Sequence, residues 1–112
     1  MKALGRKGEA LAAAYLSERG YQILEVNWRC ARGELDLVAR DGKVLVFIEV
    51  KTRRSQRHGT AAEAVDARKQ EKIRSLALNY IHQTGKTAAA YRFDVVTVDA
   101  RTEQVTVIQN AF

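Results

Sequence analysis

The sequence predicts an α/β fold in which helices flank a β-sheet, with elements in the order α-β-β-β-α-β-β. Two segments rich in Ala, Leu and charged residues favour helices. Between them, the pair Asp41-Gly42 separates two runs of strand-forming residues, the pattern of a β-hairpin. The second run, Val44 to Ile48, is continuously apolar, as in a central strand covered on both faces. This order indicates an α/β sandwich rather than a βαβαβ nucleotide-binding fold.

The first helix is expected from Leu4 to Arg19, because Gly20 follows in the position where glycine most often ends a helix. Its expected apolar face consists of Leu4, Leu11, Tyr15 and Ala14. A strand is expected next, from Tyr21 to Trp28, with Ile23 and Leu24 at its centre.

The hairpin brings polar residues to one face of the sheet. If Asp41 and Gly42 are its two loop residues, Asp36 faces Phe47 and position 34 faces position 49. Side chains alternate between faces with a period of two. One face then carries Glu34, Asp36, Val38, Leu45, Phe47, Glu49 and Lys51. The other face is aliphatic and forms core: Leu35, Leu37, Val44, Val46, Ile48 and Val50.

The second helix is expected from Thr60 to about Thr84, ending at Gly85, because Thr60 and Glu63 match the S/T-x-x-E capping box. Its expected apolar face is Val65, Ile73, Leu76, Ala77 and Tyr80. Two strands follow, Tyr91 to Val98 and Gln104 to Ile108. Since no linker or repeat interrupts the chain, residues 1–112 are interpreted as a single domain.

The composition points to a basic cytoplasmic protein. Lys and Arg outnumber Asp and Glu by 19 to 13, a net charge of +6 that favours a polyanionic partner, nucleic acid first. No apolar run approaches the ~20 residues that cross a membrane, and no signal-peptide core is visible. A single cysteine, Cys30, excludes an intrachain disulfide and a thiolate metal cage.

The polar end of the hairpin face is a candidate metal site. In the expected register Asp36 and Glu49 are diagonal neighbours, roughly 7–8 Å apart at the backbone, so their carboxylates can converge on one ion. Each like-charge contact costs about 1 kcal/mol in water and about 4 kcal/mol at an effective dielectric of 20. Mg²⁺ or Mn²⁺ would neutralise this repulsion. Lys51 could hold or deprotonate a water, or stabilise phosphate charge.

The alternative is that these are solvated strand-edge charges, with Lys51 as an ion-pair partner of the carboxylates. A one-residue slip of the hairpin would send Asp36 and Glu49 to opposite faces and remove the proposed site. Asp94, which interrupts an apolar strand, is interpreted as a hydrogen-bonded structural carboxylate.

Several separated blocks of the chain resemble one known signature. They are residues 5–10 (GRKGEA), 33–38 (GELDLV), 45–53 (LVFIEVKTR) and 92–96 (RFDVV). In this order, spanning nearly the whole chain, they resemble the YraN-like family of small, largely uncharacterised bacterial proteins. That family is similar to the archaeal Holliday-junction resolvases and belongs to the restriction-endonuclease-like, or PD-(D/E)xK, superfamily.

The resemblance implies a mixed sheet flanked by helices, one or two metal ions and phosphodiester hydrolysis. By position, Asp36 and Glu49 would be metal ligands and Lys51 the catalytic lysine. Glu9 would join the metal site. In the second helix, Lys69 or Gln70 matches a position that often assists the site.

Phosphate contacts are expected from the basic residues around this site: Arg53, Arg54, Arg57, Lys69 and Gln70. If they neutralise several phosphates, affinity should fall steeply with salt. The sequence shows no base-reading helix or aromatic platform, so substrate shape is expected to matter more than base sequence.

The leading hypothesis is an endonuclease that uses Mg²⁺ or Mn²⁺ to hydrolyse structured DNA, branched or flapped. DNA is favoured over RNA. The alternatives are a non-catalytic nucleic-acid-binding accessory protein with a nuclease-like fold, and a dimeric protein-interaction module. The resemblance also favours a homodimer, because two scissile strands need two sites, although the sequence alone does not establish one.

Overall fold

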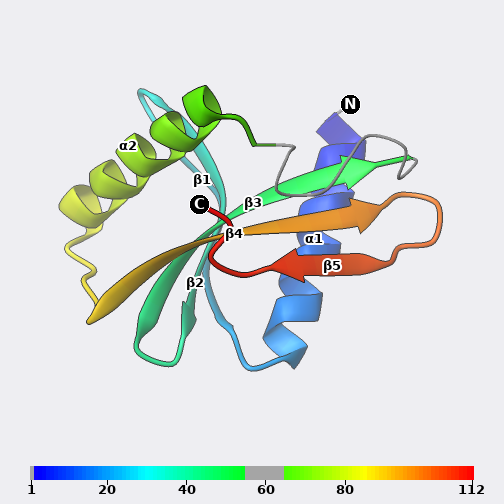
Figure 1. Ribbon diagram of the computed structural model, residues 1–112, viewed down its shortest axis with the longest axis horizontal. Coiled ribbons are helices and arrows are strands. Elements are labelled where there is room, and N and C mark those ends of the chain that lie inside the picture. The colour runs from blue at the N-terminus through cyan, green and yellow to red at the C-terminus, as the bar shows by residue number, and fades with distance from the viewer. Residues whose placement is uncertain (1, 55–64) are drawn as a thin grey trace.

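The described residues form helices and strands in the predicted order (Figure 1). This computed structural model describes residues 2–54 and 65–112, with side chains from residue 5 onward. The elements are α1 (Lys2–Glu18), β1 (Gln22–Cys30), β2 (Gly33–Asp41), β3 (Val44–Arg53), α2 (Ala67–Thr84), β4 (Ala90–Asp99) and β5 (Val105–Ile108). The order α-β-β-β-α-β-β is therefore confirmed.

The strands form one mixed sheet with the order β1-β2-β3-β4-β5. Strands β3 and β4 pair in parallel, and the other neighbours pair antiparallel. A parallel pair needs a crossover connection, and α2 lies in the connection between β3 and β4. The central position predicted for β3 is confirmed, as is the mixed sheet flanked by helices.

The two helices cover opposite faces of the sheet, and β3 contributes alternate residues to both faces (Figure 1). On the α1 face the buried cluster is Ala12, Leu16, Tyr21, Leu37, Ala39, Val46, Ile48, Val96 and Val98. On the α2 face it is Leu35, Val38, Leu45, Phe47, Val65, Ile73, Leu76, Ala77, Tyr80 and Val95. The apolar run of β3 is thus covered on both sides, as predicted.

Helix α1 buries a different line of residues from the one predicted. Gly8, Ala12 and Leu16, spaced four apart, are buried, whereas Ala14 is exposed. Successive residues at i and i+4 lie on one helix face, which explains the line. Gly20, with φ 93°, ends the helix as predicted, and the Tyr21 amide donates to the Leu16 carbonyl at 3.0 Å in a Schellman motif.

The hairpin register differs from the prediction by two residues. Asp41 pairs with Val44 and Arg40 with Leu45, so the loop residues are Gly42 and the following lysine. Asp41 stays in the ladder because the Arg92 guanidinium binds its carboxylate at 3.0 Å. A shift of two keeps each side chain on its predicted face.

Leu35 is an exception to this alternation. It packs in the α2-side cluster, whereas Leu37 packs on the α1 side. Pairing of β2 with β3 stops at Leu37 and Ile48, so the start of β2 diverges from β3 while it stays paired with β1, and Leu35 packs toward α2.

Helix α2 begins later than predicted. Asp66 is extended, with φ −75° and ψ 174°, and its Oδ1 accepts a hydrogen bond from the Lys69 amide at 2.9 Å, so it is the N-cap. The expected start at Thr60 is therefore wrong, and Thr60 and Glu63 themselves lie outside the described residues. Val65 is buried, but it precedes the helix. Neither α1 nor α2, the helices of the part described, is long and apolar enough to cross a membrane.

Candidate metal-binding and active site

Asp36 and Glu49 meet where the ladder between β2 and β3 ends. They are the next residues along their strands after the paired Leu37 and Ile48. The Val50 amide donates to Asp36 Oδ2 at 2.8 Å. The acceptor for this amide is therefore the side chain of Asp36 rather than a backbone carbonyl of β2. The register shift of two replaces the expected diagonal arrangement, and a hydrogen bond joins the two carboxyl groups. Their convergence on one metal ion stays a prediction.

The pKa of Asp36 is strongly raised in this pair. Burial raises the pKa of Asp36 to about 8, with further increases from the negative charge of Glu49 and from a hydrogen bond between the two carboxyl groups. The Val50 amide opposes this rise in pKa. Glu49 is only 8% exposed. Such a pair is unfavourable in the protein unless a proton or a cation neutralises it.

Two lysines approach the same oxygen of Glu49. Lys51 Nζ lies 3.7 Å and Lys69 Nζ 3.3 Å from Glu49 Oε2. Lys51 comes from β3 itself, and Lys69 comes from the first turn of α2, held there by the Asp66 cap. Their side chains are 34% and 46% exposed, so both ammonium groups also reach solvent. The structure therefore brings the predicted Asp36, Glu49, Lys51 and Lys69 together.

Glu9 approaches the site through a close contact between α1 and β3. A Cβ on Gly8 would overlap the hydroxyl of Thr52, so only glycine lets the helix come this near. Burial raises the pKa of Glu9, and the charges of Glu34 and Glu49 raise it further. Glu9 thus lies within electrostatic reach of Glu49. Sequence reasoning missed this contact, and its signal is a glycine inside a helix, which costs about 1 kcal/mol relative to alanine.

The pair Asp36 and Glu49 fits a divalent metal ion. No three His, Cys, Asp or Glu side chains converge as a complete metal site within the described residues, so the expected three-carboxylate set is not closed. However, Mg²⁺ is usually held by one or two carboxylates together with waters and substrate phosphates. Two adjoining, mutually repelling carboxylates are hard oxygen donors of this kind.

The other predicted site residues lie around this pair or beyond it. Gln70 donates from Nε2 to the Val65 carbonyl at 2.9 Å, so it holds the chain that enters α2. Arg53 is partly buried, and its carbonyl accepts from the Ala100 amide at 2.7 Å. Arg54 is exposed at the end of β3. Arg57 lies outside the described residues.

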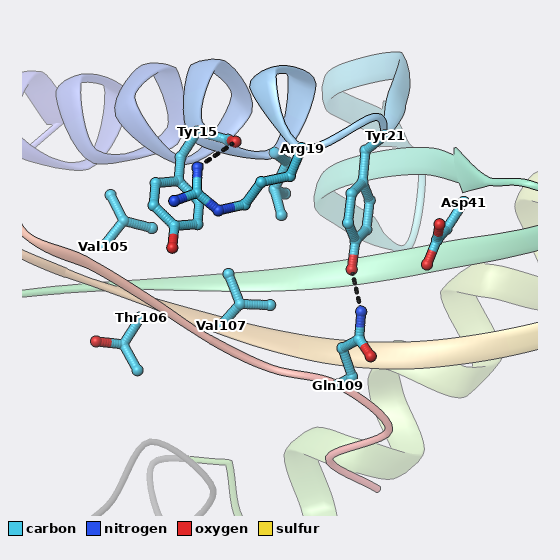
Figure 2. Close-up of a pocket in the computed structure, with 9 residues that line it drawn as sticks. Tyr15, Arg19, Tyr21, Asp41, Val105, Thr106, Val107 and Gln109 are labelled. Atoms are coloured by element: carbon cyan, nitrogen blue, oxygen red, sulfur yellow. Dashed lines mark hydrogen bonds between the residues drawn. The ribbon is translucent and has the colours of Figure 1, made fainter.

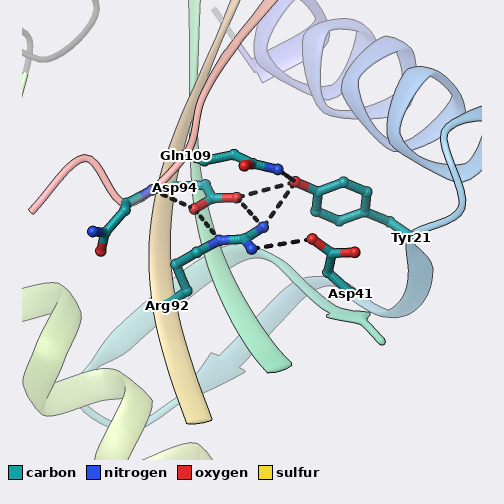
Figure 3. A network of polar contacts seen from close by, with 6 residues as sticks. Tyr21, Asp41, Arg92, Asp94 and Gln109 are labelled. Atoms are coloured by element: carbon teal, nitrogen blue, oxygen red, sulfur yellow. Dashed lines mark hydrogen bonds and ion pairs between the residues drawn. The ribbon is translucent and has the colours of Figure 1, made fainter. Parts of the chain in front are cut away.

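A second polar cluster, the Arg92 cluster, was not predicted as a unit. It consists of Tyr21, Asp41, Arg92, Asp94 and Gln109 (Figure 3). Asp94 is completely buried, yet its oxygens accept from Arg92 Nε at 2.8 Å, Arg92 Nη2 at 2.9 Å and the Asn110 amide at 2.9 Å. The interpretation of Asp94 as a hydrogen-bonded structural carboxylate is confirmed.

A hollow of about 650 Å³ lies beside the Arg92 cluster (Figure 2). It is lined by Tyr15, Leu16, Arg19, Tyr21, Asp41, Val105, Thr106, Val107 and Gln109. The guanidinium of Arg19 lies 3.4 Å above the Tyr15 ring, and Tyr21 accepts from Gln109 at 2.8 Å. Tyr15, Leu16 and Arg19 lie at the end of α1 away from Glu9, and neither Asp36 nor Glu49 lines this hollow, so it is separate from the carboxylate pair.

The chain matches known proteins along most of its length. The family model described as "Uncharacterised protein family UPF0102" matches residues 8–98. A "UPF0102 protein" of Moorella thermoacetica is 49% identical over 112 residues, covering 96% of this chain and 93% of that one. Another, of Pelotomaculum thermopropionicum, is 44% identical over 115 residues, covering 99% and 96%. The chain therefore belongs to UPF0102, the YraN-like family that its sequence blocks indicated.

Proposed function

We propose that the protein is a metal-dependent endonuclease that hydrolyses phosphodiester bonds in branched or flapped DNA. The observation that carries the proposal is the pair Asp36 and Glu49, with Lys51 and Lys69 at 3.7 and 3.3 Å from one oxygen of Glu49. A carboxyl group whose pKa is raised by burial and by a neighbouring carboxylate, as that of Asp36 is, does not stabilise a fold at neutral pH. Strongly perturbed groups of this kind cluster at functional sites.

Each residue has a defined part in this proposal. Asp36 and Glu49 hold Mg²⁺ or Mn²⁺, which when bound supplies positive charge to the phosphate and acidifies a water. Lys51, partly exposed, donates hydrogen bonds to the attacking water or to a phosphate oxygen. Lys69 keeps Glu49 in position from the α2 side. Glu9 adds negative charge at the edge of the site and so favours cation binding.

The charge around the pair suits a polyanionic substrate. Besides the two lysines at Glu49, exposed cations lie at the end of β3 and in the first turns of α2: Arg54, Arg68 and Lys72. The whole chain carries a net charge of +6. For binding that depends on such contacts, the logarithm of the binding constant falls linearly with the logarithm of the salt concentration.

Cleavage assays test the proposal directly. Labelled single-stranded, duplex, flap and four-way-junction DNA is incubated with Mg²⁺ or Mn²⁺ and either the wild type or Asp36→Asn. Asparagine can still accept the Val50 amide, so the variant removes charge with little change in geometry. We expect wild-type cleavage that a chelator abolishes and a loss of at least about 100-fold in the variant, or about 2.7 kcal/mol of barrier.

Lys43→Met is the matched purification control, because Lys43 is exposed in the turn at the opposite end of β3. It should cleave like the wild type. Binding of DNA without cleavage, unchanged in Asp36→Asn, would instead identify a non-catalytic nucleic-acid-binding protein.

A further inference from the structure

We propose, on the basis of the function above, that a second site beside the carboxylate pair binds the DNA phosphate next to the scissile one, through Arg6 and Arg29. The site is a hollow of about 160 Å³ lined by Gly5, Arg6, Glu9, Asn27, Arg29 and Glu34, called here the Arg6–Arg29 hollow. Its volume is below the roughly 300–1,000 Å³ of pockets for whole small molecules, so it suits a single phosphate group.

The hollow adjoins the proposed active site on the α1 side. Glu9 lines the hollow, and its carboxyl group is affected by the charge of Glu49. Glu9 in turn affects Asp36. Lys69 approaches Glu49 from α2, on the other face of the sheet. A strand crossing the end of the sheet would therefore meet cations on both sides of the carboxylate pair.

The backbone holds Arg29 at the rim of the hollow. Asn27 has φ 58°, a left-handed conformation that asparagine tolerates better than most residues. With its amide nitrogen toward Glu34, Asn27 donates to Glu34 Oε2 at 2.9 Å and accepts from Arg29 Nη2 at 3.3 Å. Arg29 Nε also lies 3.3 Å from Glu34 Oε2. Strained residues of this kind persist where neighbouring contacts fix them, often at ligand sites.

The ion pair between Arg29 and Glu34 leaves the guanidinium available to a phosphate. The two side chains are 63% and 47% exposed, and pairs this exposed contribute at most about 1 kcal/mol. A phosphate oxygen can accept two parallel N–H bonds from arginine, a stronger arrangement than one long contact. Glu34 thus orients Arg29 before the substrate binds. When DNA binds, the phosphate replaces Glu34 as the partner of Arg29.

Arg6 and Arg29 also counter the acidic side of the hollow. Both line the hollow together with Glu9, so both are placed to offset the repulsion between Glu9 and an incoming phosphate. Without them, DNA approaching from the α1 side would meet Glu9 and Glu34 as like charges. The arginines thereby determine on which side of the site the second phosphate is held.

Fluorescence anisotropy with labelled flap DNA in chelator separates binding from cleavage. We expect Arg6→Met and Arg29→Met each to weaken binding about 5- to 10-fold and to reduce the log–log salt slope by about 0.9, the value for one lost phosphate contact. Glu34→Gln should strengthen binding about 2- to 5-fold, because it removes a repelling charge. Lys43→Met, on the far turn, is the control for loss of one cation and should leave the slope within error.

A flap DNA with a neutral methylphosphonate next to the cleavage position, combined with the arginine variants, tests the proposed contact directly. The methylphosphonate should weaken binding by the wild type but have no further effect on the double variant Arg6→Met/Arg29→Met, because the two arginines and the phosphate charge make up the same contact. Additive losses would overturn the inference. So would unchanged affinity in both arginine variants while the wild type still cleaves, and in that case the proposed nuclease function stands. A wild type that neither binds nor cleaves DNA would overturn both.

Discussion

Two polar clusters at opposite ends of α1 surround their aspartates, Asp94 and Asp36, with opposite kinds of neighbours. At one end, Asp94 is fully buried but accepts hydrogen bonds from Arg92, Tyr21 and the Asn110 amide. At the other end, Asp36 accepts one backbone amide and lies against Glu49. Arg92 neutralises the charge of Asp94 within the chain. In the carboxylate pair the two lysines approach Glu49, whereas burial and the charge of Glu49 raise the pKa of Asp36.

The difference shows which cluster stabilises the fold and which is maintained for chemistry. The bonds of the Arg92 cluster tie together the end of α1, the end of β2, strand β4 and the C-terminal segment (Figure 3). Fully satisfied networks of this kind rigidify a structure. A carboxyl group with a strongly raised pKa, such as that of Asp36, weakens it at neutral pH, and local departures from favourable chemistry are expected at functional sites.

Removing Asp94 should have the largest effect on stability. Asp94→Ala leaves the Arg92 guanidinium, which is 17% exposed, without its main partner. Breaking a buried pair in this way costs about 3–5 kcal/mol, so we expect the free energy of unfolding in urea at pH 7 to fall by that amount. Asp41→Asn is the comparison, because Asp41 is 37% exposed and its loss should cost less than about 1 kcal/mol. Equal losses in the two variants would contradict the view that the buried pair of Arg92 and Asp94 is the main support of this cluster.

Replacing Asp36 should stabilise the protein instead. The folded-state pKa of about 8 lies above the unfolded value near 3.9, so the folded protein retains a proton that the unfolded chain releases between these pH values. The stabilisation that comes from this retained proton is therefore present at low pH and is lost as pH rises from about 4 to 8. We expect Asp36→Asn to raise the free energy of unfolding by at least about 2 kcal/mol at pH 8 and to change it little at pH 4.

Metal addition sharpens the same measurement. At pH 8, millimolar Mg²⁺ or Mn²⁺ should raise the unfolding midpoint of the wild type, because it binds the folded state, and should have little effect on Asp36→Asn. A wild-type stability that stays flat between pH 4 and 8 and does not respond to either ion would remove the electrostatic basis of the proposed site.

The sequence predicted the elements and faces because their signals are local. Apolar alternation assigned Asp36 and Glu49 to one face, and this assignment survives the two-residue register error since the side-chain period is two. The register itself depends on Asp41, which Arg92 holds from a strand 51 residues away. The turn motif Asp41-Gly42 gives no indication of that contact with Arg92.

The start of α2 and the contact of Gly8 with Thr52 were missed for a related reason. Both Thr60 and Asp66 are good capping residues, and a sequence pattern alone does not choose between them. The choice of Asp66 depends on burial of Val65 just before the helix. Likewise, the contact of Gly8 with Thr52 joins elements far apart in the chain.

That contact yields a prediction of intermediate size. Gly8→Ala should destabilise the protein by about 1–3 kcal/mol, because the new methyl group overlaps the Thr52 hydroxyl and overpacked cores cost this much. Thr52→Ala in the same chain should restore most of the loss, because it removes the overlapping atom. The double-mutant cycle in urea checks this, and additive losses would show that α1 does not rest on Thr52.

The smallest effect is expected at the cap of α2, and it should reach only one of the two clusters. Asp66→Ala removes the acceptor of the Lys69 amide and should cost about 1 kcal/mol. Because Lys69 lies in that first turn, its contact with Glu49 at 3.3 Å should loosen, whereas Arg92 and Asp94 touch no part of the turn. Amide hydrogen exchange measures this locally: protection should fall in the first turn of α2 and at the end of β3, and remain unchanged in β4. A uniform fall across the sheet would mean that the cap supports the whole fold. The carboxylate pair would then not be a locally independent region, as the raised pKa of Asp36 implies that it is.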